Sequence, residues 1–403
     1  MTTETTPTEH QPLSRALVAL MATAIGVVVA NLYYLQPLLH QVRHDFHIGT
    51  TNASLLITLI QAGYAAGLAF VLPLGDLLPR RKLVVGVFLV AALTMCVGAL
   101  LTSFVAFAAV TFVIGLTSVG GQILIPFAAD LADPAQRGRV IGRVMSGLLF
   151  GILLSRTISG LVAQFAGWRS VYWGAAVLLG VMALELHRSL PDEPMRAKVK
   201  YSSLVAGSFS LLVSLAPLRR RAWFGAMIFA GFSAIWTTLA FHLSVAPFHY
   251  SNGAIGLFGL FGVAGVLAAN IAGHHADKQR TRTATVLSAL LILASFAIFS
   301  FGRASFWMMS IGLVVLDAGM QGMQITNQSV IYALLPEARS RINSAYMVCA
   351  FTGASLGSYA AGQMYARFSW TGVCWLGVGI SLGILLPALF WRTPPTEASS
   401  QRD

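Results

Sequence analysis

Long runs of uncharged, mostly apolar residues alternate with short basic stretches along the whole chain. Thirty uncharged positions separate Asp45 from Asp76, and 47 separate Lys82 from Asp130. A membrane-spanning helix needs about 20 mostly apolar residues, so the first run holds one span and the second holds two. The same reasoning over the whole chain predicts twelve spans. All should be helices, because the spans of an outer-membrane barrel are strands of about 10 alternating residues.

The composition agrees with this interpretation. Of 403 residues, 56% are hydrophobic and only 10% are charged, whereas a soluble domain carries about 25% charged residues. A set of soluble domains is therefore excluded, and the chain is predicted to be an all-α integral membrane protein. Its three cysteines lie inside apolar runs and show no disulfide framework.

The net charge of +12 is at first compatible with a nucleic-acid partner. If the N-terminus is cytoplasmic, however, the predicted cytoplasmic segments hold 21 of the Lys and Arg residues and the outer segments hold 4. Lys and Arg gather in the cytoplasmic loops of membrane proteins. The charge therefore predicts orientation, with both termini in the cytoplasm and the lipid bilayer as partner, and nucleic acid is not expected.

The longest polar stretch, 188–221, divides the chain into six spans and six. We expect an N-terminal half at 16–187 and a C-terminal half at 222–391, with cytoplasmic tails at 1–15 and 392–403.

An internal repeat relates these halves. At an offset of 202 residues, identical residues recur in the last three spans of each half, among them the pairs Gly120/Gly322, Pro134/Pro336, Arg137/Arg339, Gly151/Gly353, Trp168/Trp370 and Trp173/Trp375. The repeat predicts two parallel six-helix halves. Halves of this kind usually rock about a central site, which is a transporter architecture.

The loop after the second span, at 73–82, reads PLGDLLPRRK. It resembles the cytoplasmic signature of the major facilitator superfamily, Gly-x-x-x-Asp-Arg-x-Gly-Arg-Arg, although both glycines and the first arginine are replaced. The resemblance extends to a weaker copy in the second half and to the end of the fourth span. It implies the superfamily's fold, a monomer in the bacterial inner membrane, and a cytoplasmic gate formed by Asp76, Arg80, Arg81, Asp130, Arg137 and Asp277. The alternative is that these are ordinary positive-inside charges.

The fifth span carries Gly147 and Gly151. These glycines resemble the fifth-span signature of the superfamily's antiporters, but its proline and later glycines are missing. Close helix packing is the alternative role.

Two charges are isolated deep inside spans. Arg156 lies 12 residues before Trp168, and Asp317 lies 11 residues after Phe306, so equal helical rises place them at similar depth. A charge within a span costs about 2.5–3.5 kcal/mol and should face a partner or a cavity. Asp317 and Arg156 are therefore candidates for proton coupling, or alternatively a purely structural pair.

In the superfamily, the first, fourth, seventh and tenth spans line the cavity. The resemblance, together with the polar and aromatic residues of these spans, indicates cavity candidates at Asn31, Tyr33, Tyr34, Gln36, Gln122, Trp236, His242, Gln321, Gln324 and Asn327. An apolar cavity with a few amides suits a moderately hydrophobic or polyol-like solute. Interhelical hydrogen bonding is the alternative role for each of them.

None of the four lysines precedes Ser or Thr, so a Walker A phosphate loop is excluded. No metal-spaced set or catalytic constellation is seen, and neither a cofactor nor enzymatic activity is expected. The chain most resembles the drug/proton antiporter and sugar-efflux branch. We expect a secondary active transporter that exports a small organic solute, drug-like or sugar-like, in exchange for protons by alternating access. The alternative is proton-coupled uptake of a sugar, nucleoside or organic acid.

Overall fold

A computed structural model describes residues 14–192, 200–262, 281–335 and 338–390. Within these ranges every regular element is a helix, as predicted. Nine helices in the described part are long and apolar enough to cross a membrane, and three shorter apolar helices accompany them. The predicted fold class, an all-α bundle of membrane-spanning helices, is confirmed.

The first half contains α1 (Arg15–Ala30), α2 (Leu39–Asp45), α3 (Thr50–Ala66), α4 (Arg80–Leu100), α5 (Phe104–Thr117), α6 (Gly120–Leu131), α7 (Arg137–Ala166) and α8 (Trp168–Ser189). Helix α3 continues through a π turn and a 3-10 turn as far as Asp76. Helices α5 and α6 form one span that is interrupted at 118–119.

The second half contains α10 (Ala216–Leu243), α11 (Asn252–Leu257), α13 (Thr281–Phe301), α14 (Phe306–Leu334) and α15 (Arg339–Phe390). Helix α11 lies within the helical segment Asn252–Gly262, where the eighth span leaves the described residues. Helix α15 comprises two spans, because Ser369 interrupts it with φ 54° and ψ −151°. Between the halves, α9 (Tyr201–Ser214) is a short helix without buried residues.

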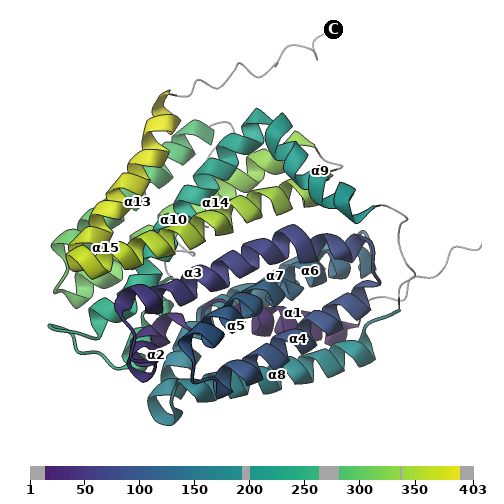
Figure 1. The fold of residues 1–403 in the computed structure, drawn as a ribbon. Coiled ribbons are helices and arrows are strands. Elements are labelled where there is room, and N and C mark those ends of the chain that lie inside the picture. Colours follow the sequence, from purple (N-terminus) through teal and green to yellow (C-terminus); the bar gives the residue numbers. More distant parts are fainter. Residues whose placement is uncertain (1–13, 193–199, 263–280, 336–337, 391–403) are drawn as a thin grey trace, which may run out of the picture.

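The two halves lie side by side, with α3 of the first half against α15 of the second (Figure 1). Hydrogen bonds join them along this seam. Gln61 and Ser233 bond reciprocally at 2.8 and 2.9 Å, and the Ser355 hydroxyl donates to the carbonyl of Thr58 at 3.0 Å. The residue limits of the halves stay a prediction.

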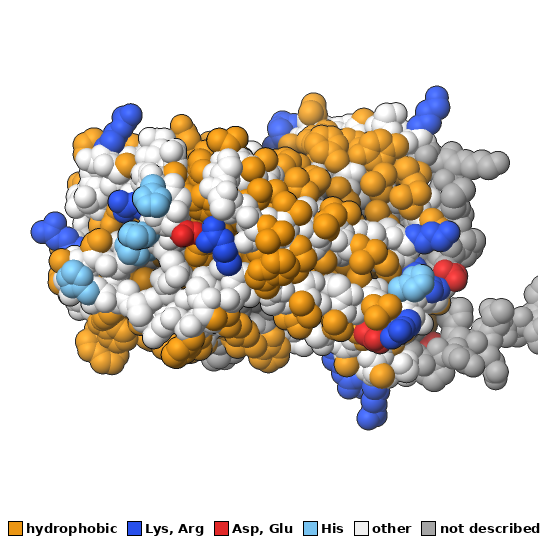
Figure 2. Space-filling view, turned by 60° about the horizontal axis from the view of Figure 1, so that its bottom comes forward, with side chains coloured by type: hydrophobic (Ala, Val, Ile, Leu, Met, Phe, Trp, Pro, Cys, Tyr) orange, Lys and Arg blue, Asp and Glu red, His pale blue; other side chains and the backbone are white. Residues whose placement is uncertain are grey.

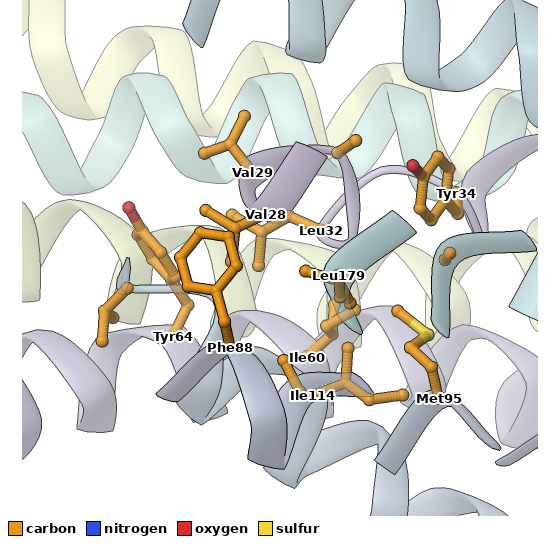
Figure 3. Close-up of a cluster of buried hydrophobic side chains, with 14 of the residues drawn as sticks. Val28, Val29, Leu32, Tyr34, Ile60, Tyr64, Phe88, Met95, Ile114 and Leu179 are labelled. Atoms are coloured by element: carbon orange, nitrogen blue, oxygen red, sulfur yellow. The ribbon is translucent and has the colours of Figure 1, made fainter. Parts of the chain in front are cut away.

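Apolar side chains fill the interior of each half. Figure 3 shows part of the first-half core, to which five helices contribute: Val28 from α1, Ile60 and Tyr64 from α3, Phe88 and Met95 from α4, Ile114 from α5 and Leu179 from α8. The surface is apolar as well. Hydrophobic side chains occupy the middle of the face in Figure 2, and charged and histidine side chains gather toward its two ends. An apolar surface between polar ends suits a lipid environment.

Glycine contacts recur in the same way in both halves. A β-carbon at Gly147 of α7 would lie 2.1 Å from the carbonyl oxygen of Ala22 in α1, and one at Gly353 of α15 would lie 2.2 Å from that of Ala226 in α10. Only glycine permits backbones to approach this closely. The first and fifth spans of each half are therefore packed in equivalent ways, and packing accounts for Gly147.

Candidate functional site

The α-helix of the first span ends before the span does. Helix α1 ends at Ala30, and residues 31–35 form turns. Here Tyr33 N–H donates to Ala30 O at 2.9 Å and Gln36 N–H donates to Tyr33 O at 3.1 Å. Each bond joins residues three apart in the sequence, which is the pattern of a 3-10 helix rather than of an α-helix. Pro37 follows and has no N–H with which to continue an α-helix.

This broken segment holds Arg156 of α7. The Arg156 side chain is buried, and its Nε donates to Gln36 Oε1 at 2.6 Å. Its guanidinium carbon lies 4.5 Å from the ring centroid of Tyr33 and 4.1 Å from that of Trp236 on α10. Cation–π attraction of this kind is worth about 2 kcal/mol when the groups are desolvated. Arg156 therefore contacts both halves.

The helical segment Asn252–Gly262 places Asp317 near Arg156. A β-carbon at Gly256 would lie 2.5 Å from the carbonyl oxygen of Arg156, and one at Gly259 would lie 3.2 Å from Arg156 Cβ. One turn further on, a β-carbon at Gly262 would lie 2.5 Å from Asp317 Oδ2. Both charged residues therefore lie against one glycine-lined helix face.

Arg156 and Asp317 do not form a direct ion pair. Every ion pair found among the described residues joins other groups, although Arg156 and Asp317 each lie within electrostatic range of the other. Asp317 on α14 is 6% exposed. The arrangement is a shared buried site with two separated charges of opposite sign.

Three N–H donors around this site have no hydrogen-bond acceptor among the described residues. They are Arg156 Nη2, Gln36 Nε2 and Trp236 Nε1. Their three residues line one cavity of about 10 Å³, together with Pro37, Leu239, Ala240 and Ile255. This volume is room for about one water molecule. Buried donors without partners are rare in native structures.

The other predicted amides are engaged elsewhere. Gln122 donates to the Tyr64 hydroxyl at 3.2 Å. Gln324 accepts a hydrogen bond of 2.6 Å from Tyr346, to whose hydroxyl Asn327 donates at 3.2 Å. The interhelical role accounts for these three residues.

The structure does not bring the remaining cavity candidates into contact with Arg156. His242 bonds to the carbonyl of Arg303 at 2.8 Å and stacks on Trp370, with 4.3 Å between ring centroids. Asn31 is buried, and its amide has no partner in the described part of the chain. Tyr34 lines a separate groove along α1 and α7, and Gln321 is half-buried on α14.

Two of the predicted gate residues, Arg80 and Arg81, form ion pairs. Arg80 is 7% exposed and bonds to Asp130 at 2.8 Å, which joins α4 to α6 within the first half. Arg81 pairs with Asp192 at 2.8 Å. Asp76 is exposed and forms no ion pair with a described residue.

Of the other two gate candidates, Arg137 donates from Nε to the Ala129 carbonyl at 2.9 Å, and Asp277 lies outside the described residues.

The buried position of Arg221 was not predicted from the sequence, because Arg221 falls at the end of the polar stretch 188–221 and was counted among the charges of the cytoplasmic loops. Helix α10 begins at Ala216, so Arg221 falls in its second turn, where it is 8% exposed. It donates to Thr285 at 2.9 Å and to Asn327 at 3.3 Å. Its position, last in a run of three arginines and directly before an apolar stretch, was the available signal.

A larger groove, of about 700 Å³, has a different lining from the small cavity beside Arg156. It is lined by α1, α7 and Leu178 of α8, with Arg15 and Arg143 among its residues and the exposed side chain of Phe150 at its edge. Its lining includes none of the three unpartnered donors.

The family model of the Major Facilitator Superfamily matches residues 18–302 and 246–402. The chain is 45% identical to the uncharacterized transporter YgaY of Escherichia coli O157:H7 over 95% of its own length and 97% of that protein. It is 33% identical to a transporter of Streptomyces coelicolor over 93% of its length and 88% of that protein.

Solved structures show the same fold. The nucleoside transporter NupG superposes with a TM-score of 0.72 at 13% identity, covering 93% of this chain and 100% of that one. A D-xylose–proton symporter superposes with a TM-score of 0.72 at 14% identity, covering 95% and 98%. The three proteins therefore share one fold.

Proposed function

Because the chain belongs to the Major Facilitator Superfamily, a family of multi-pass membrane transporters, we propose that it moves a small organic solute across the membrane by proton-coupled alternating access. The observation that carries this proposal is the buried Arg156, which Gln36 and Tyr33 of the first half and Trp236 of the second half enclose together.

A site shared by two halves is opened or closed by their relative motion. At the end of the bundle that carries Asp45, the halves are in contact: Asn252 Nδ2 donates to Gln41 Oε1 at 2.9 Å, and a β-carbon at Gly160 would lie 2.4 Å from the Asn252 carbonyl oxygen. A solute can enter from this end only when these contacts part. That requirement supports alternating access.

Asp317 is the residue we assign to proton coupling. An acid within a span is costly in its charged form and marks proton pathways in transporters. Asp317 is buried against the glycine-lined segment and lies within electrostatic range of Arg156. A change in its protonation therefore alters the charge of the site. An inward proton supplies about 2.3 kcal/mol per 100 mV, with the pH gradient in addition.

Two coupling schemes remain candidates. Export in exchange for protons, the expectation from sequence, requires that solute and proton compete for the site. Its sequence support, the fifth-span glycines, is accounted for by packing on α1. Uptake with protons requires that solute and proton bind together. The unpartnered donors beside Arg156 suit a solute that carries acceptors in either scheme.

The test uses the full-length protein in liposomes loaded with a pH-sensitive dye, exposed to panels of monocarboxylates, sugars, nucleosides and lipophilic amines. We expect at least one panel to drive a proton flux, and its direction relative to the solute separates exchange from co-transport. Asp317→Asn should abolish the flux, whereas Asp133→Asn, which lies on the surface loop after α6, should retain it. An undiminished flux in Asp317→Asn would remove the coupling role.

A further inference from the structure

We propose that Arg156, Gln36 and Trp236 recognise the carboxylate of a small organic monoanion, whose apolar part lies against Leu239 and Ile255. This inference rests on the proposed function only in taking the bound anion to be the transported solute.

The three donors converge on one cavity. Arg156 Nη2, Gln36 Nε2 and Trp236 Nε1 lack an acceptor in the described part of the chain, and their side chains line the same small space. Each residue is at least nine-tenths buried. A buried donor without a partner costs about 1–3 kcal/mol, so three in one place would destabilise the protein considerably. A ligand that brings several acceptor lone pairs satisfies all three.

The chemistry of the donors selects a carboxylate. The faces of the Arg156 guanidinium are near the rings of Tyr33 and Trp236, and its Nε is already bonded to Gln36. An N–H at the guanidinium edge therefore remains for an in-plane acceptor. Planar oxyanions match this edge, and hydrogen bonds between ionised partners are about twice as strong as neutral ones.

The charges of the site favour a monoanion. Arg156 contributes one positive charge, and Asp317 is the acidic group that acts on it electrostatically. A dianion would exceed the positive charge available and would meet Asp317 as a second like charge. The apolar lining residues Leu239, Ala240 and Ile255 leave no further polar groups for a second anionic group.

The donors belong to both halves, since Gln36 and Arg156 come from the first and Trp236 comes from the second. In this conformation the cavity of about 10 Å³ accommodates about one water molecule. A carboxylate therefore requires a small separation of the halves, after which it bridges them. Binding of the anion therefore depends on how far the two halves are separated.

Protonation of Asp317 should strengthen binding of the anion. Arg156 is the charged group that acts on Asp317 among the described residues, and Tyr33 acts on Arg156 from the first half. When Asp317 is neutral, the positive charge of Arg156 is no longer offset. Proton and anion then bind together, which is the requirement of co-transport.

The experiment is equilibrium dialysis of the purified full-length protein in nanodiscs with radiolabelled benzoate, using benzamide and benzylamine as neutral and cationic competitors of the same shape. We expect benzoate to bind and benzamide and benzylamine not to displace it. Affinity should be higher at mildly acidic than at mildly alkaline pH, at both of which benzoate stays ionised. Absence of benzoate binding, or equal displacement by benzamide, overturns the proposal.

Variants assign the binding to this cavity. Trp236→Phe keeps an aromatic ring but removes the indole N–H together with the five-membered ring that carries it, and should weaken benzoate binding about tenfold or more. Arg156→Lys keeps the charge but loses the planar edge, and should also weaken it. The matched control is Trp223→Phe on the same helix, where Trp223 is 47% exposed and donates to the Gly383 carbonyl at 3.0 Å. Wild-type affinity in Trp236→Phe, or an equal loss in Trp223→Phe, overturns the assignment.

Asp317→Asn should bind benzoate with no dependence on pH, because the amide resembles the protonated acid. A pH dependence that persists in this variant overturns the linkage. These measurements involve no proton gradient, so failure of benzoate binding leaves the transport proposal standing. Loss of proton flux alone leaves the anion site standing.

Discussion

The guanidinium carbon of Arg156 lies 4.1 Å from the ring centroid of Trp236, and the two residues belong to different halves of the molecule. This contact joins α7 to α10 at the depth of the buried acid Asp317. A motion that separates the halves must break it. The residue that binds the solute in our proposal is therefore also a residue that holds the halves together.

Arg156→Met should separate stability from function. The charge of Arg156 costs about 2.5–3.5 kcal/mol within the span, whereas its bond to Gln36 contributes about 1.5–3 kcal/mol and its cation–π contacts contribute about 2 kcal/mol. These opposing contributions nearly cancel, so the variant should leave the free energy of unfolding within about 1–2 kcal/mol of wild type, as measured by thermal unfolding in detergent. Transport should be lost. Arg80→Met, which breaks the ion pair with Asp130, should instead lower the unfolding temperature, and a similar fall in Arg156→Met would contradict the prediction.

Gly160→Ala should disturb the contact between α7 and the segment Asn252–Gly262. Its β-carbon would lie 2.4 Å from the carbonyl oxygen of Asn252, so the helices must move apart. We expect a loss of about 1–3 kcal/mol in unfolding free energy, as for other overpacked sites. Gly142→Ala on the same helix meets nothing within 4 Å and should be neutral or stabilising by up to about 1 kcal/mol. Equal effects of the two variants would show that the close approach is unimportant.

The Asp45 carboxylate should make stability depend on pH. Burial acts to raise the pKa of Asp45, but hydrogen bonds from Arg169 and Trp168 and the charge of Arg169 outweigh it and hold the pKa below its usual value. A lowered folded-state pKa means that the folded protein binds the proton less readily than the unfolded chain. The stabilisation is present above the unfolded-state pKa of about 3.9 and is lost as the pH falls through the folded-state pKa.

Thermal unfolding measured from neutral to strongly acidic pH checks this. Asp45→Asn should lower the unfolding temperature at neutral pH and reduce its decline in acid. The same acid decline in Asp45→Asn as in wild type would assign the effect to other carboxylates.

Asp130→Asn should destabilise the first half. Arg80 is 7% exposed, and the variant leaves its charge without the carboxylate that lies 2.8 Å away. Because the Asp130 side chain is 44% exposed, water moderates the loss, and we expect about 1 kcal/mol from thermal unfolding. Asp133→Asn, three residues along the same chain segment, should change stability by only a few tenths of a kcal/mol. A larger effect at Asp133 would contradict the importance of the Arg80 pair.

The twelve spans and the two-half fold could be predicted because lipid imposes a local rule. Each helix must supply about 20 apolar residues and satisfy its own backbone, so charges such as Asp45 and Lys82 reveal the boundaries directly. Arg156 and Asp317 could be singled out for the same reason, since a charge within an apolar run is costly wherever it lies. Their common depth also followed from helical rise, and both do contact the same segment.

The partners of these residues could not be predicted, because they depend on which helices meet. The break of the first span after Ala30 brings Gln36 to Arg156, although the span is part of an unbroken apolar run. Arg221 counted as a loop charge because the start of α10 at Ala216 is not marked by composition. Gln321, Gln324 and Asn327 were all predicted to face the cavity, yet the hydroxyl of Tyr346 on α15 bonds to Gln324 and Asn327.

By itself, the sequence determined the membrane environment, the helical spans, the internal repeat and the two buried charges. These follow from the cost of placing polar groups in lipid, which each segment meets on its own. Only the tertiary structure decided that Arg156 lies between Tyr33 and Gln36 of one half and Trp236 of the other, and that its N–H shares a cavity with two more unpartnered donors. Contacts of this kind arise from the packing of helices distant in sequence, at distances that no single segment encodes.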